Sequence, residues 1–301
     1  RRVLCKENYY YVINGYKDIF LDKTATVDEI YEKNTKFEHL YGLFSFDREL
    51  KSLLLRKLLK FENNIKTKIA YYFSETFPNS LDYFNVNNFD FKNSNTVIDI
   101  KKAKAVTKLI SNMSKVIQSG IGRKGTIEHY INNYGYVPLW VLVKQMSFGE
   151  ISSFYECSTT KVKNKIAKKL IGEYVTDYQG DPSFKGNLLL SPHHLERILL
   201  FFSFYRNICA HDERLYNYVK IAHLPKDLPL HKVNNITPVG NVFDLMITLK
   251  LFLTFKEYKK LVKELRESLA RLKHIQKPKK YIEILNMMGF PSDWEDTLML
   301  V

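Results

Sequence analysis

The 301-residue chain contains few cysteines and no spacing that would bind zinc. Three cysteines are an odd number, and none stands in a C-x-x-C pair, so we expect neither a disulfide framework nor a zinc site: Cys5, Cys157 and Cys209. Free, scattered cysteines are typical of a reducing compartment, which favours a cytoplasmic protein. We also expect no metal and no other cofactor, because no cluster of Asp and Glu has the spacing of a two-metal nuclease site.

Long hydrophobic runs are also missing. The two longest are Ile198–Tyr205 and Leu245–Phe255, and Lys250 interrupts the second. A helix needs about 20 apolar residues to cross a bilayer, so no membrane span is predicted. No signal peptide is recognisable, and because the first residue is not Met we expect the natural sequence to begin earlier.

What the chain has in excess is positive charge and aromatic side chains. The formal net charge is +14, and aromatic residues make up 14% of the sequence. Such a surplus of Lys and Arg usually accompanies a polyanionic partner, most often nucleic acid and next an anionic membrane surface. The plainer alternative is that the charge serves solubility alone.

The hydrophobic pattern is helical almost throughout, which predicts an all-α fold. Apolar residues recur every three or four positions from about Phe37 to Phe77. Ser147 with Glu150, and Ser191 followed by Pro192, are helix-start signals, and the second predicts a helix that runs to about His211. We expect a single helical unit over 1–301, with an N-terminal part of about 1–120 and a second part of about 121–301.

The segment Tyr205–Asn217 is the most informative, because polar residues follow directly after an apolar run. If the helix continued, Asn207, His211 and Arg214 would share one stripe. Arg206 and His211 would be about 140° apart and could not easily hold one phosphate from a single straight helix. Either the helix loosens near Cys209, or two copies face each other across a two-fold axis. We favour the second, a composite site with two Arg and two His.

Arginine and histidine together suit RNA cleavage without a metal. An imidazole can take the proton of a ribose 2′-OH or donate one to the leaving 5′-oxygen. A guanidinium can hold the phosphate and stabilise the charge that develops on it. Asn207 could orient the histidine or bond a phosphate oxygen. The spacing R-x-x-x-x-H is by itself weak, since it recurs by chance.

The R-N-x-x-x-H arrangement at Arg206–His211 resembles the signature of the HEPN superfamily. The longer string R-N-x-C-A-H-x-x-R-L-x-N, which ends at Asn217, resembles more closely the Abi family of abortive-infection proteins (AbiD/AbiF-like). Further stretches resemble that family in order along the chain: Asn8-Tyr9-Tyr10, Asn14-Gly15-Tyr16, Phe46-Asp47-Arg48-Glu49-Leu50, Phe61-Glu62, Pro138-Leu139-Trp140, Ser147-Phe148-Gly149, Met288-Gly289-Phe290-Pro291 and Trp294.

This resemblance implies a HEPN-like helical bundle with additional helices. It also implies a metal-independent endoribonuclease that acts as a toxin in phage defence, with Arg206 and His211 catalytic and a homodimer as the assembly. RNA would be the substrate, and in some members of the family a small structured RNA restrains the protein.

Plainer structural roles compete with these functional ones. His211 could be a core histidine, and Arg206 could be neutralised by Glu213 or by an acidic residue elsewhere. Arg214 and Asn217 are expected either to support the site or to end the helix. Cys209 is given no catalytic role, because an unactivated cysteine on a packed helix is usually core.

Surface groups are also ambiguous. The lysines of Thr160–Leu170 could follow an RNA backbone or form a solvated face: Lys161, Lys163, Lys165, Lys168 and Lys169. The same holds for the basic region Lys256–Lys280. Tyr9, Tyr10 and Tyr16 could stack on bases, but we expect them to pack in the core.

Two other functions remain open from the sequence. The chain could be a non-catalytic RNA-binding protein that holds a structured small RNA, in which case it would bind RNA with steep salt dependence and never cut it. It could also be a toxin that a protein antitoxin neutralises.

Overall fold

The computed structural model describes residues 7–24, 29–92, 97–181, 184, 186, 188–211, 213–220 and 224–300. Within these ranges the protein is built from helices, and the only strand-like pairings are three isolated bridges. The prediction of an all-α fold is confirmed. The α-helices are α1 Phe37–Thr76, α2 Ile100–Gly120, α3 Thr126–Tyr134, α4 Leu139–Gln145, α5 Phe148–Cys157, α6 Thr160–Tyr178, α7 Pro192–Ala210, α8 Pro229–Val233, α9 Val242–Lys250, α10 Phe255–Ile275, α11 Pro278–Met287 and α12 Trp294–Leu300.

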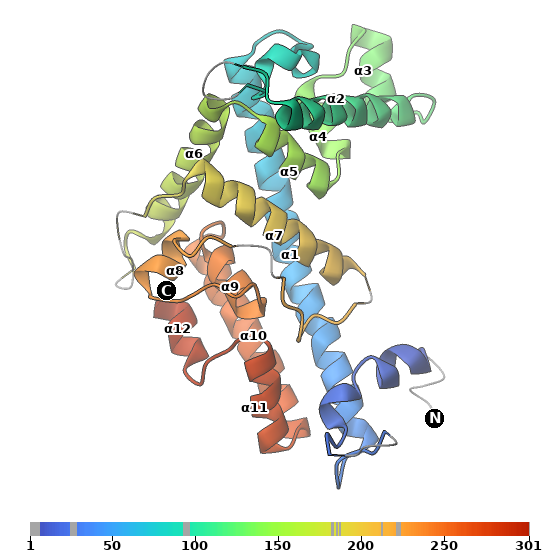
Figure 1. The fold of residues 1–301 in the computed structure, drawn as a ribbon, viewed down its shortest axis with the longest axis vertical. Coiled ribbons are helices and arrows are strands. Elements are labelled where there is room, and N and C mark those ends of the chain that lie inside the picture. The colour runs from blue at the N-terminus through green and yellow to red at the C-terminus, as the bar shows by residue number, and fades with distance from the viewer. Residues whose placement is uncertain are drawn as a thin grey trace.

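Helix α1 is the axis of the molecule (Figure 1). Its 40 residues correspond to a rod of about 60 Å. The apolar positions that predict it, among them Leu43, Leu54 and Ile65, are fully buried. Helices α4, α6, α7 and α10 pack against it, so the part of the chain before residue 120 and the part after it share one core.

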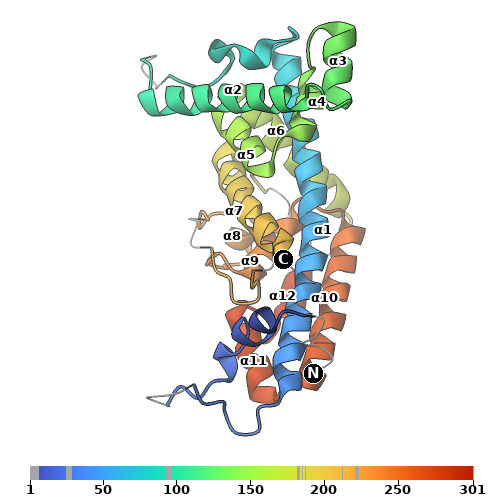
Figure 2. The ribbon, with the colours of Figure 1, turned by 90° about the vertical axis from the view of Figure 1, so that its right-hand side faces the viewer.

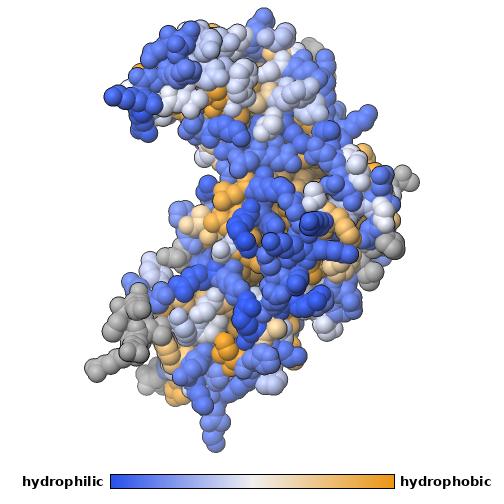
Figure 3. Space-filling view, turned by 180° about the vertical axis from the view of Figure 1, so that it is seen from behind, coloured by the Kyte–Doolittle hydropathy of each residue, from blue (hydrophilic) through white to orange (hydrophobic). Residues whose placement is uncertain are grey.

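An upper lobe crosses one end of this axis. Figures 1 and 2 show α2 lying across the end of α1, beside α3 and α4. Helix α2 packs mainly on α5, which in turn packs on α7. Seen from behind, the surface is indented between this lobe and the body (Figure 3). The lobe is therefore separated from α7 by one layer of helix.

The helix-start signals are confirmed. Ser147 accepts the N–H of Glu150, and Ser191 accepts the N–H of His194, so both serines satisfy the free donors at the start of α5 and α7. Helix α2 begins at Ile100, and the Asp99 side chain caps it by accepting the N–H groups of Lys101 and Lys102.

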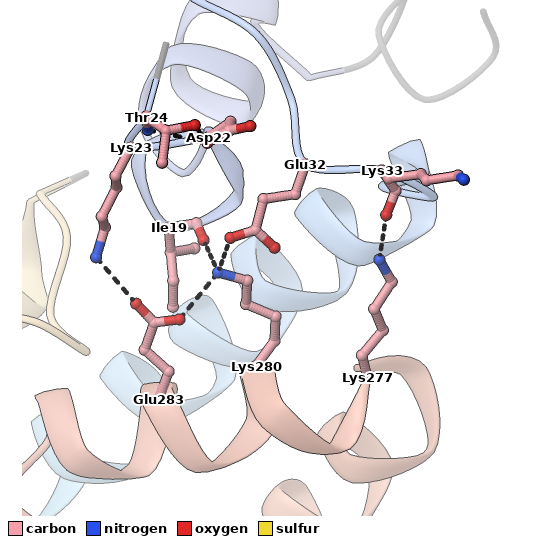
Figure 4. A network of polar contacts seen from close by, with 9 residues as sticks. All are labelled: Ile19, Asp22, Lys23, Thr24, Glu32, Lys33, Lys277, Lys280 and Glu283. Atoms are coloured by element: carbon pink, nitrogen blue, oxygen red, sulfur yellow. Dashed lines mark hydrogen bonds and ion pairs between the residues drawn. The ribbon is translucent and has the colours of Figure 1, made fainter.

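Lys280 of α11 links the N-terminal segment to the C-terminal helices (Figure 4). The Lys280 ammonium is buried, and it donates to the Ile19 carbonyl at 2.5 Å, Glu32 at 2.7 Å and Glu283 at 2.9 Å. Lys277 donates to the Lys33 carbonyl from the same helix. A buried ammonium group needs hydrogen-bond partners, so these contacts of Lys280 fix where the N-terminal segment lies.

Candidate functional site

Helix α7 carries the R-N-x-x-x-H string at its C-terminal end. Its apolar residues, including Ile198, Phe202 and Tyr205, are fully buried. The helix ends at Ala210, and His211 is its C-cap, with extended backbone at φ −113° and ψ 166°. This agrees with the helix end predicted near His211. Arg206 thus lies in the last turns and His211 on the first residue past them.

Arg206 is held by an acidic residue of α1. Its Nε lies 3.3 Å from Oε2 of Glu62, and its side chain is 31% exposed. Glu62 is almost fully buried and also accepts from Lys66 at 2.8 Å. The partner anticipated for Arg206 therefore exists, but it is Glu62 and not Glu213. Because the guanidinium has five donors and is partly exposed, it can still offer N–H groups to an incoming phosphate.

His211 is exposed, so the alternative of a core histidine is wrong. Its backbone N–H donates to the Asn207 carbonyl at 3.1 Å, which keeps its Cα on the path of the helix. Within the described part of the chain, the imidazole has no hydrogen-bond partner. Asn207 is exposed too, and its side-chain oxygen lies 3.5 Å from Nη1 of Arg206.

The expected stripe of Asn207, His211 and Arg214 does not form. The helix ends at Ala210, so Arg214 lies in the irregular segment that follows it. There its Nη1 lies 2.8 Å from Oδ2 of Asp18, and this hydrogen bond raises the pKa of Arg214. Asn217 is exposed in a turn. The structure therefore brings Arg206, Asn207 and His211 to the helix end and places Arg214 against the N-terminal segment.

A second acidic residue of α1 holds the segment that follows the motif. Asp47 is fully buried and accepts the backbone N–H groups of Leu215 and Tyr216 at 3.0 and 2.7 Å. It also accepts the Tyr16 hydroxyl at 2.7 Å, and the Tyr16 ring stacks on Tyr216. These bonds fix the chain just after His211. Tyr16 is core, as expected, whereas Tyr9 and Tyr10 are exposed, which corrects that expectation for both.

Lys51, one turn further along α1 than Asp47, also holds the segment after His211. Its buried ammonium donates to the Glu213 carbonyl at 3.1 Å. Burial raises the pKa of the Asp47 carboxyl, while its hydrogen bonds and the nearby Lys51 charge oppose the shift. Burial also raises the pKa of Cys209 to about 12, which disfavours the reactive thiolate form.

Asp47, Lys51 and Glu62 were not predicted from the sequence as parts of the site. Asp47 lies between Leu43 and Leu50, and Glu62 lies four residues after Leu58 and three before Ile65. Both acidic residues thus interrupt the buried stripe of α1. A carboxylate among buried apolar residues needs a hydrogen-bond or ion-pair partner. The two acidic residues within the apolar pattern of this helix were therefore the available signal in the sequence.

The lysines of α6 do not form one open surface. Lys163 is buried and lies 2.6 Å from Glu196, so it cannot line an exposed RNA-binding face. Lys165 lies 2.7 Å from Glu75, and Lys169 lies 3.9 Å from Glu173. Lys161 and Lys168 are exposed. RNA binding at the other four lysines stays a prediction.

Metal-binding clusters and membrane-spanning helices are both absent from the described residues. No group of three or more His, Cys, Asp or Glu side chains is placed to hold a metal ion. No described helix is both long enough and apolar enough to cross a membrane.

The geometry defines what chemistry this helix end can perform. The end of α7 carries a partly exposed guanidinium and, on the first residue past the helix, an exposed imidazole. One can bind and neutralise a phosphate, and the other can transfer a proton. The buried Glu62 and Asp47 hold the two ends of this segment to α1.

Comparison with known proteins agrees with the resemblance found in the sequence. A family model described as Abi-like protein matches residues 2–217. No curated protein and no solved structure matches the chain. The Met288-Gly289-Phe290-Pro291 stretch lies beyond the matched residues. Since the match covers well over half of the 301 residues, the chain belongs to the family of Abi-like proteins.

Proposed function

We propose that this protein is a metal-independent endoribonuclease of the HEPN kind that acts in abortive infection, the phage defence after which its family is named. RNA would be cut by attack of a ribose 2′-oxygen on the adjacent phosphorus, which breaks the P–O5′ bond and leaves a 2′,3′-cyclic phosphate and a free 5′-OH. His211 would accept the 2′-OH proton and donate a proton to the leaving 5′-oxygen, and Arg206 would stabilise the charge on the phosphate. The observation that carries the proposal is the end of α7, where Glu62 holds a partly exposed Arg206 close in sequence to an exposed His211.

The site is proposed to be shared by two copies of the chain. Residues five apart point about 140° apart on an ideal helix, so one helix end would not aim both Arg206 and His211 at one phosphate. Two helix ends related by a two-fold axis would place the arginine of one copy opposite the histidine of the other. Asn207 would lie at the same junction, and its side-chain oxygen is already close to Arg206.

Substitution of the two residues tests the activity. Arg206→Ala and His211→Ala are each expected to abolish RNA cleavage and growth arrest while the protein stays folded. His193→Ala, an exposed histidine in the first turn of the same helix, and Arg56→Ala, an exposed arginine of α1, are the matched controls. Full activity in either site variant would overturn the assignment. Salt-dependent RNA binding with no cleavage by the wild type would favour the non-catalytic RNA-binding alternative.

Mixing the two inactive variants tests the shared site. If each site takes Arg206 from one copy and His211 from the other, a mixed dimer keeps one intact pair, and the mixture regains part of the activity. If each chain builds its own site, the mixture stays inactive. Sedimentation of the wild type and the mixture would establish that both are dimers.

A further inference from the structure

Helix α2 carries an unusual concentration of positive charge. Its 21 residues include five lysines and no Asp or Glu. One of them, Lys102, faces inward and lies 3.0 Å from Asp90. The other four are exposed: Lys101, Lys104, Lys108 and Lys115. Among the described residues, none of these four ammonium groups has an acidic partner.

These four side chains, the α2 lysine row, lie on one face of the helix. At 100° per residue they fall within an arc of about 60°, and they extend over about 21 Å along the axis. The buried residues Val106, Leu109 and Met113 occupy the other side, which packs toward α5. Packing therefore fixes the direction of Lys104, Lys108 and Lys115, whereas Lys101 also borders a hollow lined by Asp90 and Glu156.

Other lysine-rich helices carry acidic residues among their lysines. The shallow groove beside α6, of about 690 Å³, is lined by three lysines and three acidic residues: Lys165, Lys168, Lys169, Glu75, Glu173 and Asp177. On α10, Lys260 and Lys263 lie 3.8 and 4.0 Å from glutamates one turn later. Helix α2 thus differs from α6 and α10 in having no acidic residue of its own, although Asp90, Glu156 and Glu196 line the hollow beside Lys101 and Lys102.

We propose that the α2 lysine row binds the phosphate backbone of an RNA stem without reading its sequence. A straight, rigid row of point charges suits a regular backbone, and lysine binds phosphate without demanding a fixed angle. The row has no aromatic side chain to stack on unpaired bases. The choice of RNA over another polyanion rests on the proposed ribonuclease function.

The location of the row separates binding from cleavage. Helix α5 lies between α2 and α7, so the row and the Arg206–His211 segment belong to different layers. Changes in the row are therefore expected to alter how RNA is recruited and not the chemistry at α7. The basic turn after α2, with exposed Arg123 and Lys124, would extend the same contact.

Binding of a hairpin to full-length protein tests this proposal. The probe is an RNA hairpin with a stem of roughly 16 base pairs, in the His211→Ala background so that it is not cut. The triple variant Lys104→Gln/Lys108→Gln/Lys115→Gln should raise Kd about tenfold or more near 0.15 M salt. The slope of log Kd against log salt should fall by about 2 to 3, because three phosphate contacts are lost.

The matched control removes three exposed lysines from α10, in the variant Lys256→Gln/Lys260→Gln/Lys263→Gln. It should leave Kd within about twofold of the parent, since these lysines are not in the row. An unchanged Kd in the α2 variant, or an equal loss in both variants, would overturn the proposal. So would equal affinity for a DNA duplex of the same length, or tighter binding to phosphatidylserine vesicles than to the hairpin.

A second assay distinguishes failure of the lysine-row proposal from failure of the ribonuclease proposal. It measures cleavage of a short single-stranded RNA by the α2 variant with His211 intact. Lost hairpin binding with retained cleavage supports both. If no RNA is cut by any form of the protein, the ribonuclease assignment fails while the result for the row still stands. If the α2 variant loses cleavage of the short RNA as fully as His211→Ala does, the row belongs to the site and the separation is wrong.

Discussion

The carboxylate of Glu62 lies 3.3 Å from Nε of Arg206 and joins the middle of α1 to the last turns of α7. The same carboxylate accepts from Lys66, and the Glu62 and Lys66 side chains are both less than 9% exposed. One buried anion thus serves two cations. The orientation of Arg206 therefore depends on α1 as well as on its own helix.

Replacement of Glu62 by Gln is expected to reduce both stability and RNA cleavage. The amide cannot neutralise the buried Lys66, and loss of one partner of a buried pair typically costs about 3 kcal/mol or more. Arg206 would also lose its charged anchor, so cleavage should fall even at a temperature where the variant is folded. Urea denaturation and a cleavage assay measure the two effects.

The double variant Glu62→Gln/Lys66→Met separates these two roles. Removal of both buried charges should recover much of the stability, because no ammonium is left without a partner. Cleavage should stay low, because Arg206 still lacks its carboxylate. If the double variant regained full cleavage, Glu62 would act only through stability and would not position Arg206.

Helix positions were predictable from the sequence because they depend on local chemistry. Ser147 and Ser191 predict the starts of α5 and α7 through the side-chain bonds that they form. The end of α7 was also placed correctly near His211. What depends on tertiary packing was not predictable, such as the pairing of Arg206 with a residue 144 positions earlier.

The prediction failed where the chain leaves the helix. The stripe of Asn207, His211 and Arg214 assumes that the helix continues, but the segment after His211 is held by Asp47 and Lys51 of α1. The backbone bonds that these residues supply replace those of a further helical turn. The spacing of the α6 lysines also predicted an RNA-binding face that includes Lys163. It could not show that Lys163 is buried and paired with Glu196.

Replacement of Lys280 by Met is expected to loosen the N-terminal segment. The ammonium of Lys280 satisfies Ile19, Glu32 and Glu283 at once, and the loss of these bonds should cost about 1 to 3 kcal/mol. Amide hydrogen exchange within residues 7–24 should become faster. Lys279→Met, an exposed neighbour on the same helix, is the control and should change neither quantity. Equal rates of amide exchange in the Lys280→Met and Lys279→Met variants would show that the Lys280 contacts do not stabilise the N-terminal segment.

The stability of the fold should also depend on Asp244 at acid pH. Burial tends to raise the pKa of this carboxyl, but hydrogen bonds from His231 and from the backbone of Gly240 and Val239 lower it below its usual value. A depressed pKa in the folded state gives stability that is present above the ordinary value near 3.9 and is lost as pH falls through the folded value.

Asp244→Asn is therefore expected to be much less stable than the wild type near pH 6, and the difference should narrow as pH falls below about 4. Thermal melts over this range would measure it. Asp227→Asn is a suitable comparison, since the Asp227 side chain is exposed and pairs with His194 at the start of α7. A difference that is constant with pH would contradict the ionised, hydrogen-bonded state of Asp244.

The ion pair of Arg214 and Asp18 allows a direct test of what Arg214 does. The two side chains are 36% and 59% exposed, so the pair itself should contribute only about 0 to 1 kcal/mol to stability. If Arg214 only braces the segment after His211, then Arg214→Ala and Asp18→Ala should reduce cleavage equally and slightly. The exchanged pair Arg214→Asp/Asp18→Arg should then restore it.

We expect instead that Arg214 contributes to RNA binding, so that the exchanged pair does not restore cleavage. Because its guanidinium is partly exposed and lies three residues after His211, loss of its positive charge should weaken RNA binding as well. Arg214→Ala should therefore raise KM several-fold with little change in kcat, while Asp18→Ala should lower KM or leave it unchanged, since it frees the guanidinium. Rescue by the exchanged pair would instead assign Arg214 a purely structural role.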